Sequence, residues 1–106
     1  MVDFLALPTL VVEVVFDREI DPVIERPHVR LYVMPEGRPT AWVCWFPILG
    51  TCIPANRPLR MEIEVGDGHA ALRELSAGTE FRILQGDEDV GIGRVISRAT
   101  PAMTRH

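Results

Sequence analysis

Histidine, cysteine and carboxylate side chains are the groups in this chain of 106 residues that could bind a metal or carry catalysis. The three histidines, His28, His69 and His106, are widely separated and fall at a strand start, in a loop and at the last position. Consecutive carboxylates occupy 87–89, whereas a calcium loop takes its ligands from alternating positions over a longer segment. We therefore expect no metal site and interpret the acidic cluster as a solvated turn.

The cysteines and serines show no arrangement typical of a nucleophile. Cys44 and Cys52 are not grouped in the close pairs that a zinc site requires, and no histidine completes such a set. We expect a reduced Cys44 packed on a strand and a loop thiol at Cys52, with a disulfide or redox pair as the alternative. Ser76, Ser97 and Cys44 lack a nucleophile-elbow context. The sequence thus predicts no catalytic residue, no cofactor and no enzyme.

Charge and phosphate-binding motifs bear on nucleic-acid partners. A G-x-G sequence occurs at 91–93, but no helix follows to present amide groups to a phosphate, and the chain contains no lysine. The 11 basic residues are outnumbered by 15 acidic residues, and the formal net charge is −4. Dedicated nucleic-acid binders usually have a basic patch or a high pI. RNA binding is therefore possible but disfavoured, and DNA binding is not expected.

The segment 1–16 is apolar enough to raise the question of a signal peptide or a membrane span. It has no basic leading region, carries Asp3, and is interrupted by Pro8 and Glu13. It is also too short to cross a bilayer as a helix. We expect a lead-in followed by the first strand, no membrane partner and a cytoplasmic protein.

Alternating apolar and polar residues predict six β-strands, near 9–16, 28–34, 40–46, 58–65, 79–85 and 89–98. A short helix is expected at 69–75, where Leu72 and Leu75 share a face and Gly78 could cap the end. The chain is expected to form one domain over 1–106, with a poorly ordered lead-in (1–8) and tail (99–106). Short strands with almost no helix are typical of an all-β sandwich or barrel.

The last predicted hairpin favours the barrel. The apolar faces of its two strands are assigned to Phe81, Ile83, Val90 and Ile92. Gly91 and Gly93 alternate within the second strand, where glycine usually marks a bulge, a barrel corner or close backbone approach. We therefore expect a closed six-stranded antiparallel β-barrel.

Trp42 and Trp45 fall on opposite faces of the strand 40–46, which is apolar on both sides. One of them must face solvent, a loop or a partner. The long loop 47–57 is the expected cover, and an exposed binding anchor is the alternative. Three arginines flank this strand and could complement such an anchor: Arg38, Arg57 and Arg60. The alternative is that these arginines are solvated or paired with Glu36, Glu62 and Glu64.

Several motifs occur in order along the chain: Met61–Val65, Ala77–Ile83, Gly86 and Val90–Ile96. The last three match a pattern G-x-x-F-x-I-x-x-G-x-x-x-V-G-x-G-x-V. In this pattern the chain resembles the C-terminal β-barrel domain of elongation factor Tu. The strand 10–16 and an Arg-Pro pair before the strand 28–34 are also similar, so the resemblance covers most of the chain and is specific in the final hairpin.

The resemblance implies a six-stranded barrel of the translation-factor type that is not catalytic. In that family the barrel packs against the preceding barrel and the GTPase domain, helps to hold the T-stem of aminoacyl-tRNA, and binds the nucleotide exchange factor. The sequence lacks the GTPase and second domains, so GTP hydrolysis is not carried over. It has Leu84-Gln85 where the family usually has Arg-Glu, and an acidic turn at 87–89, and both departures weaken the case for tRNA contact.

Three functions follow as hypotheses. The first is a free-standing interaction module that binds a protein partner or forms a homodimer. The second is an RNA-binding accessory domain that uses the arginine-bearing side, and the third is a small-ligand carrier or enzyme that uses the barrel mouth. An exposed apolar patch would favour the first, arginines clustered on one face the second, and a lined cavity the third.

Overall fold

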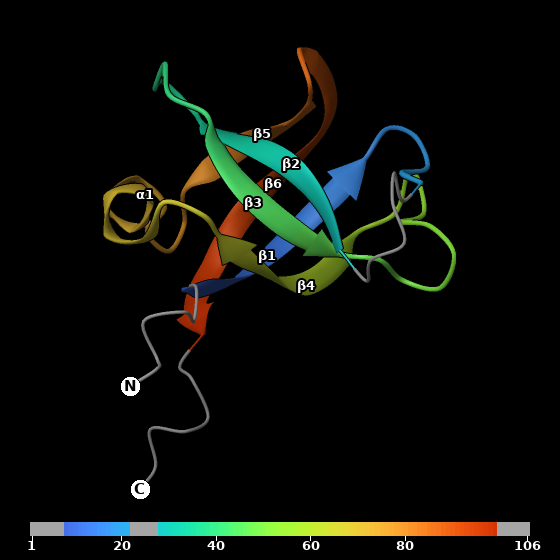
Figure 1. The fold of residues 1–106 in the computed structure, drawn as a ribbon, viewed down its shortest axis with the longest axis horizontal. Coiled ribbons are helices and arrows are strands. Elements are labelled where there is room, and N and C mark those ends of the chain that lie inside the picture. Colours follow the sequence, from blue (N-terminus) through green and yellow to red (C-terminus); the bar gives the residue numbers. More distant parts are fainter. Residues whose placement is uncertain (1–7, 22–27, 100–106) are drawn as a thin grey trace, which may run out of the picture.

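Six antiparallel strands close into a barrel in the computed structural model, which describes residues 8–21 and 28–99 (Figure 1). The strands are β1 (Thr9–Phe16), β2 (His28–Pro35), β3 (Trp42–Pro47), β4 (Leu59–Val65), β5 (Glu80–Gln85) and β6 (Glu88–Ala99). Between β4 and β5 lies a short helix, α1 (Gly68–Glu74). The predicted strands, helix and closed barrel are confirmed. The expected lead-in and tail lie outside the described residues, except for Pro8 and Ala99.

The strand order around the barrel is β1-β4-β3-β2-β5-β6, and β6 pairs with β1 to close the ring. Hairpins join β2 to β3 and β5 to β6, and each turn contains a glycine with positive φ, Gly37 at 76° and Gly86 at 64°. L side chains rarely adopt this conformation, which explains glycine at both turns. The compact turn predicted at 35–39 is confirmed, and the N–H of Arg38 donates to the carbonyl of Pro35 at 3.1 Å.

The barrel interior is filled by alternate residues of the strands. In β1, β2 and β4 every second side chain is buried, as the period-two pattern predicts. The rings of Phe16 and Phe46 meet edge to face within the core, with centroids 6.0 Å apart and planes 78° apart. This apolar filling is the main source of stability.

Both ends of the barrel are closed by apolar side chains from outside the strands. At one end α1 buries Ala71 and Leu72, followed by Leu75 (Figure 1). At the other end Ile20 and Ile53 exchange two backbone hydrogen bonds of 2.9 Å, and both side chains join the core. The long loop between β3 and β4 therefore contributes to barrel closure through Ile53.

A β-bulge near the start of β6 changes which of its residues face inward. Gly91 lies opposite Ile83, and Asp89 lies opposite Leu84, so Val90 is an additional residue in β6. Val90 is buried, as predicted. The bulge shifts the inward-outward alternation from Gly91 to Val95. A second register shift, against β1, then leaves Ile96 as another additional residue.

Ile92 was expected on the apolar face of β6, and this prediction was wrong because its side chain is 63% exposed. Beyond the bulge the interior positions of β6 are Gly91, Gly93 and the buried Val95. Gly93, for example, lies opposite the buried Phe81. The two glycines thus occupy core positions, and the isoleucine between them points outward.

The seam between β3 and β4 is the shortest in the barrel. Its registered pairs are Cys44 opposite Val65 and Trp45 opposite Glu64. Pro47 ends β3 and has no N–H to continue the ladder. The strands diverge beyond this point into the loop that carries Ile53.

Candidate functional site

Gly91 and Gly93 allow β6 to lie closer to its neighbours than any other residue type would permit. An ideal Cβ on Gly93 would be 2.6 Å from the ring of Phe81 and 2.7 Å from Cγ1 of Val14. On Gly91 it would be 2.7 Å from the carbonyl oxygen of Val15. The close approach expected at these glycines is therefore present at both.

Two hollows flank Ile92 on the surface above these glycines. The first has a volume of about 260 Å³ and is lined in part by Gly93 and Phe81. The second has a volume of about 520 Å³ and is lined in part by Gly91 and Phe16. Both share Val15, Glu36 and Ile92. We call the two hollows together the Ile92 groove; its remaining lining residues are Glu13, Asp17, Asn56, Glu80, Arg82, Asp89 and Arg94.

The rim of the Ile92 groove is charged and predominantly acidic, with five carboxylates and two guanidinium groups among its lining residues. Arg82 donates from Nε to Oδ1 of Asp89 at 3.1 Å and forms a second, shorter contact to Oδ2. These hydrogen bonds hold the pKa of the Asp89 carboxyl below its ordinary value. Arg94 lies 3.7 Å from Glu13 through Nη2 and Oε1. Both arginines of the groove are thus paired with carboxylates.

Glu36 and Glu80 differ from the other acidic residues of the groove. The N–H of Glu36 donates to the carbonyl of Glu80 at 2.9 Å, so the two residues are neighbours at one side of the groove. Both are exposed, and neither forms an ion pair with another residue in the part of the chain that the structure describes. They supply carboxylates that no described arginine contacts directly.

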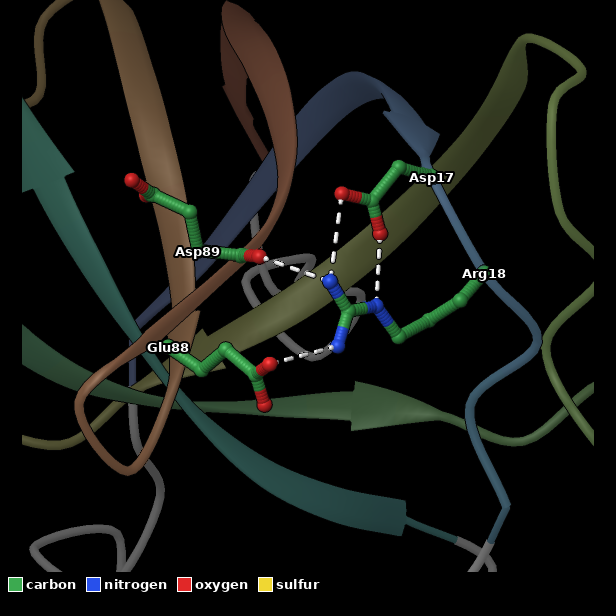
Figure 2. A network of polar contacts seen from close by, with 4 residues as sticks. All are labelled: Asp17, Arg18, Glu88 and Asp89. Carbon is green, nitrogen blue, oxygen red and sulfur yellow. Dashed lines mark hydrogen bonds and ion pairs between the residues drawn. The ribbon is translucent and has the colours of Figure 1, made fainter.

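Arg18 joins the end of β1 to the start of β6 beside the groove (Figure 2). Its guanidinium donates from Nε to Asp17 at 2.7 Å and from Nη2 to the carbonyl of Asp89 at 3.2 Å, and its Nη1 lies 3.1 Å from Oε2 of Glu88. The hydrogen bond from Arg18 lowers the pKa of Asp17. The acidic turn predicted to be solvated is therefore held in part by arginine.

No protein-family model, curated protein or solved structure matches the chain. Among the residues that the structure describes, no group of three or more histidine, cysteine or carboxylate side chains is placed to hold a metal ion. Within the same residues, no helix has the length and apolar character needed to cross a bilayer. The features of the site must therefore be interpreted from its own geometry.

Trp42, one of the residues predicted to bind a partner, has a structural role within the barrel. Its side chain packs on the core, and Nε1 donates to Oε1 of Glu74 at 3.0 Å. Glu74 belongs to α1, and its other oxygen lies 3.7 Å from Arg38. Trp42 thus ties the helix to the barrel end.

Trp45 lies on the outer face of β3, opposite Glu64 on β4 and Arg30 on β2. Its side chain is partly buried. The apolar outer face expected here continues along the next row, where Tyr32 lies between Val43 and the largely buried Leu84. This face is more shielded than the groove at Ile92.

The three arginines predicted to accompany the tryptophans are not brought together. Arg38 lies in the β2–β3 turn, near α1, whereas Arg57 and Arg60 precede and begin β4 at the opposite end of the barrel. Arg60 lies 4.0 Å from Glu13 and Arg38 lies near Glu74. Neither neighbour is one of the expected glutamates (Glu36, Glu62 and Glu64), because the barrel register places other carboxylates beside Arg38 and Arg60. All three arginines are exposed, in line with the alternative expectation that they are solvated.

The exposure of Ile92 at the surface was not predicted from the sequence. The alternation of inward and outward residues along the strand could have predicted it. Val95 lies an even number of residues from Gly91 and Gly93, and Arg94 lies two residues from Ile92. A strand with Val95 inside and Arg94 outside must point Ile92 outward. This pattern is hard to see in the sequence because the bulge at Val90 interrupts the alternation of inward and outward residues along β6.

Both cysteines are free in the structure, and the expected positions of Cys44 on a strand and Cys52 in a loop are confirmed. Cys44 is fully buried on β3, and this burial raises the pKa of its thiol to about 12. Cys52 is partly buried in the loop between β3 and β4. A thiol held protonated by burial is a poor nucleophile.

Proposed function

We propose that the chain is a non-catalytic interaction module that binds a protein partner through the Ile92 groove. The observation that carries the proposal is the 63% exposure of Ile92, a large apolar side chain set between two hollows. An apolar centre with a charged rim is the arrangement found in protein–protein interfaces. Exposed apolar patches rimmed by polar residues often mark binding sites, and here Ile92 lies beside the partly exposed Val15.

The placement of the arginines supports protein binding over RNA binding. Arg38 lies at one end of the barrel, while Arg57 and Arg60 lie toward the other. Arg38 and Arg60 also have carboxylate neighbours, and the groove itself is predominantly acidic. Phosphate binding would favour an unpaired basic surface. A ligand carrier has less support still, since core side chains fill the barrel interior.

We further propose that the barrel is of the translation-factor type. Six antiparallel strands support this, as does the packing of the motif residues. Phe81, Gly91 and Gly93 are the residues of the G-x-x-F…V-G-x-G pattern, and Gly93 lies directly against the Phe81 ring. A barrel of that type acts by binding other macromolecules, in line with the interaction module. Two free cysteines are consistent with a cytoplasmic location, which we include in the proposal.

The proposal is tested by Ile92→Ser, with Leu49→Ser as the matched control. Leu49 is the other exposed large apolar residue among those the structure describes, at 42%, and lies outside the groove. Each protein is used to isolate partners from native lysate, and the affinity of an isolated partner is measured by calorimetry. Light scattering on the same samples reports a homodimer.

We expect Ile92→Ser to weaken association by about 2 kcal/mol, roughly 30-fold, because a central apolar anchor is lost. Leu49→Ser should bind like the unmodified protein. Equal affinity of Ile92→Ser and the unmodified protein would contradict the groove as the binding surface. A protein that is monomeric at high concentration and retains no partner would contradict the interaction module itself.

A further inference from the structure

We infer that the occupant of the Ile92 groove is an extended peptide segment that carries an apolar side chain and a basic side chain two residues apart. This inference rests on the proposed function and specifies the chemistry of the partner. It assigns the basic side chain to the hollow at Gly93 and the apolar side chain to the larger hollow at Gly91. The two hollows differ in the carboxylates and the apolar residues that line them.

The hollow at Gly93 is lined by two carboxylates that form no ion pair with another described residue, Glu36 and Glu80, whereas the hollow at Gly91 is lined by Glu36 alone of these two. Glu13 lies on the same hollow and is shared between Arg94 and Arg60, at 3.7 and 4.0 Å. An arginine or lysine entering here would meet two carboxylates that are free of direct ion pairs to other described residues, and hydrogen bonds between charged groups are the stronger kind.

The hollow at Gly91 is suited to an apolar side chain. Its lining includes Val15, Phe16 and Ile92. Two of the three carboxylates at its edge are already engaged, Asp17 by Arg18 and Asp89 by Arg82. The third, Glu36, is shared with the hollow at Gly93. An apolar side chain can therefore bury surface here without leaving an ion pair broken.

The spacing of the hollows matches an extended chain. Gly91 and Gly93 are two residues apart on β6, which corresponds to about 6.6 Å along a strand. Side chains at positions i and i+2 of an extended peptide point the same way with the same separation. A peptide lying along β6 can thus place one side chain on each side of Ile92.

The experiment selects binders from a display library of random short peptides. The unmodified protein is the target, and peptides that also bind Ile92→Ser are removed. Selected peptides are synthesised, and their affinities are measured at low and high salt. The same affinities are measured for the double variant Glu36→Gln/Glu80→Gln and for Glu62→Gln, an exposed carboxylate on β4 outside the groove. Circular dichroism and denaturant midpoints verify that each variant is folded.

We expect the selected peptides to contain Arg or Lys two residues from Leu, Ile or Phe. Glu36→Gln/Glu80→Gln should weaken the binding of these peptides about tenfold and reduce the salt dependence of their affinity. Glu62→Gln should change neither quantity. Groove-binding peptides without a basic residue, or with affinity unaffected by Glu36→Gln/Glu80→Gln, would overturn this inference and leave the proposed docking surface standing. If no peptide distinguishes the unmodified protein from Ile92→Ser, both this inference and the groove as docking surface fail.

Discussion

The ring of Phe81 lies against the backbone of Gly93, so that a Cβ at position 93 would be 2.6 Å from Cε1 and Cζ of the ring. This contact affects both the packing of the barrel core and the shape of the surface. Inside the barrel, the ring occupies the space that a β6 side chain would otherwise fill. On the outer side, the same two residues line one of the hollows beside Ile92. Packing of the core and shape of the groove therefore depend on one glycine.

Replacing Gly93 with valine should destabilise the protein by about 1–3 kcal/mol, because the new side chain overpacks the core against Phe81 and Val14. Gly91→Val should do the same, since its Cβ meets backbone atoms that cannot move aside. Denaturant unfolding measures both effects. Ser97→Val, at an exposed position of β6, is the control and should change stability little. Unchanged midpoints for both glycine variants would show that these are ordinary strand positions.

Trp42→Phe should cost about 1–2 kcal/mol of unfolding free energy, because it removes the hydrogen bond from Nε1 to the Glu74 carboxylate. Trp45→Phe serves as the comparison, since its indole has no side-chain hydrogen-bond partner among the described residues. Urea unfolding followed by circular dichroism measures both variants. A Trp42→Phe protein no less stable than Trp45→Phe would argue against a structural role for the Trp42 indole.

The Cys44 thiol should be inert in the folded protein and should make stability fall at high pH. Its pKa rises from 9.0 to about 12, chiefly through burial, so the unfolded chain loses this proton at lower pH than the folded one. Stability is therefore unaffected by this thiol below pH 9 and decreases between pH 9 and 12, by about 1.4 kcal/mol for each pH unit. Cys44→Ala should flatten that decrease. A thiol reagent at neutral pH should modify Cys52 and leave Cys44 unmodified until denaturant is added; rapid labelling of native Cys44 would contradict its burial.

The carboxyl group of Asp89 should titrate below its ordinary pKa of 3.8, because Arg82 hydrogen-bonds to the charged form. The pairing therefore stabilises the fold above that pH and is lost as the pH falls through the lowered value. Carboxyl carbon shifts in an NMR titration measure the pKa directly. In Arg82→Gln the Asp89 pKa should rise toward 3.8, while the pKa of Asp17, which depends on Arg18, should stay low. No change at Asp89 would contradict the pairing.

The strands could be predicted from the sequence because burial in a barrel follows a simple alternation. In β1, β2 and β4 that alternation is unbroken, and the predicted inward residues, such as Leu10, Leu31 and Ile63, are buried. The short turns were also predictable, since glycine and proline have strong local preferences. These are properties of a few neighbouring residues, which a sequence shows directly.

The candidate site could not be predicted in the same way. The orientation of Ile92 depends on a bulge, which is set by the pairing of β6 with β5 and not by β6 alone. The partners of Trp42 and Arg60 depend on which elements the closed barrel brings together, at sequence separations that local patterns do not report. Predicting Trp42 as a binding residue overlooked that α1 could supply a carboxylate to its indole.

The short seam between β3 and β4 is the place where we expect the barrel to open locally most often. Opening there breaks the pairings of Cys44 with Val65 and Trp45 with Glu64 and the hydrogen bond from the N–H of Gly66 to the carbonyl of Val43, whereas every other seam has a longer ladder. The separated strands remain tethered by their own connecting loop, so the ring can reclose without help from another chain. In the strand order this seam lies directly across the ring from the β5–β6 pair. The barrel can therefore open between β3 and β4 while the Ile92 groove, on the opposite side of the ring, keeps its shape.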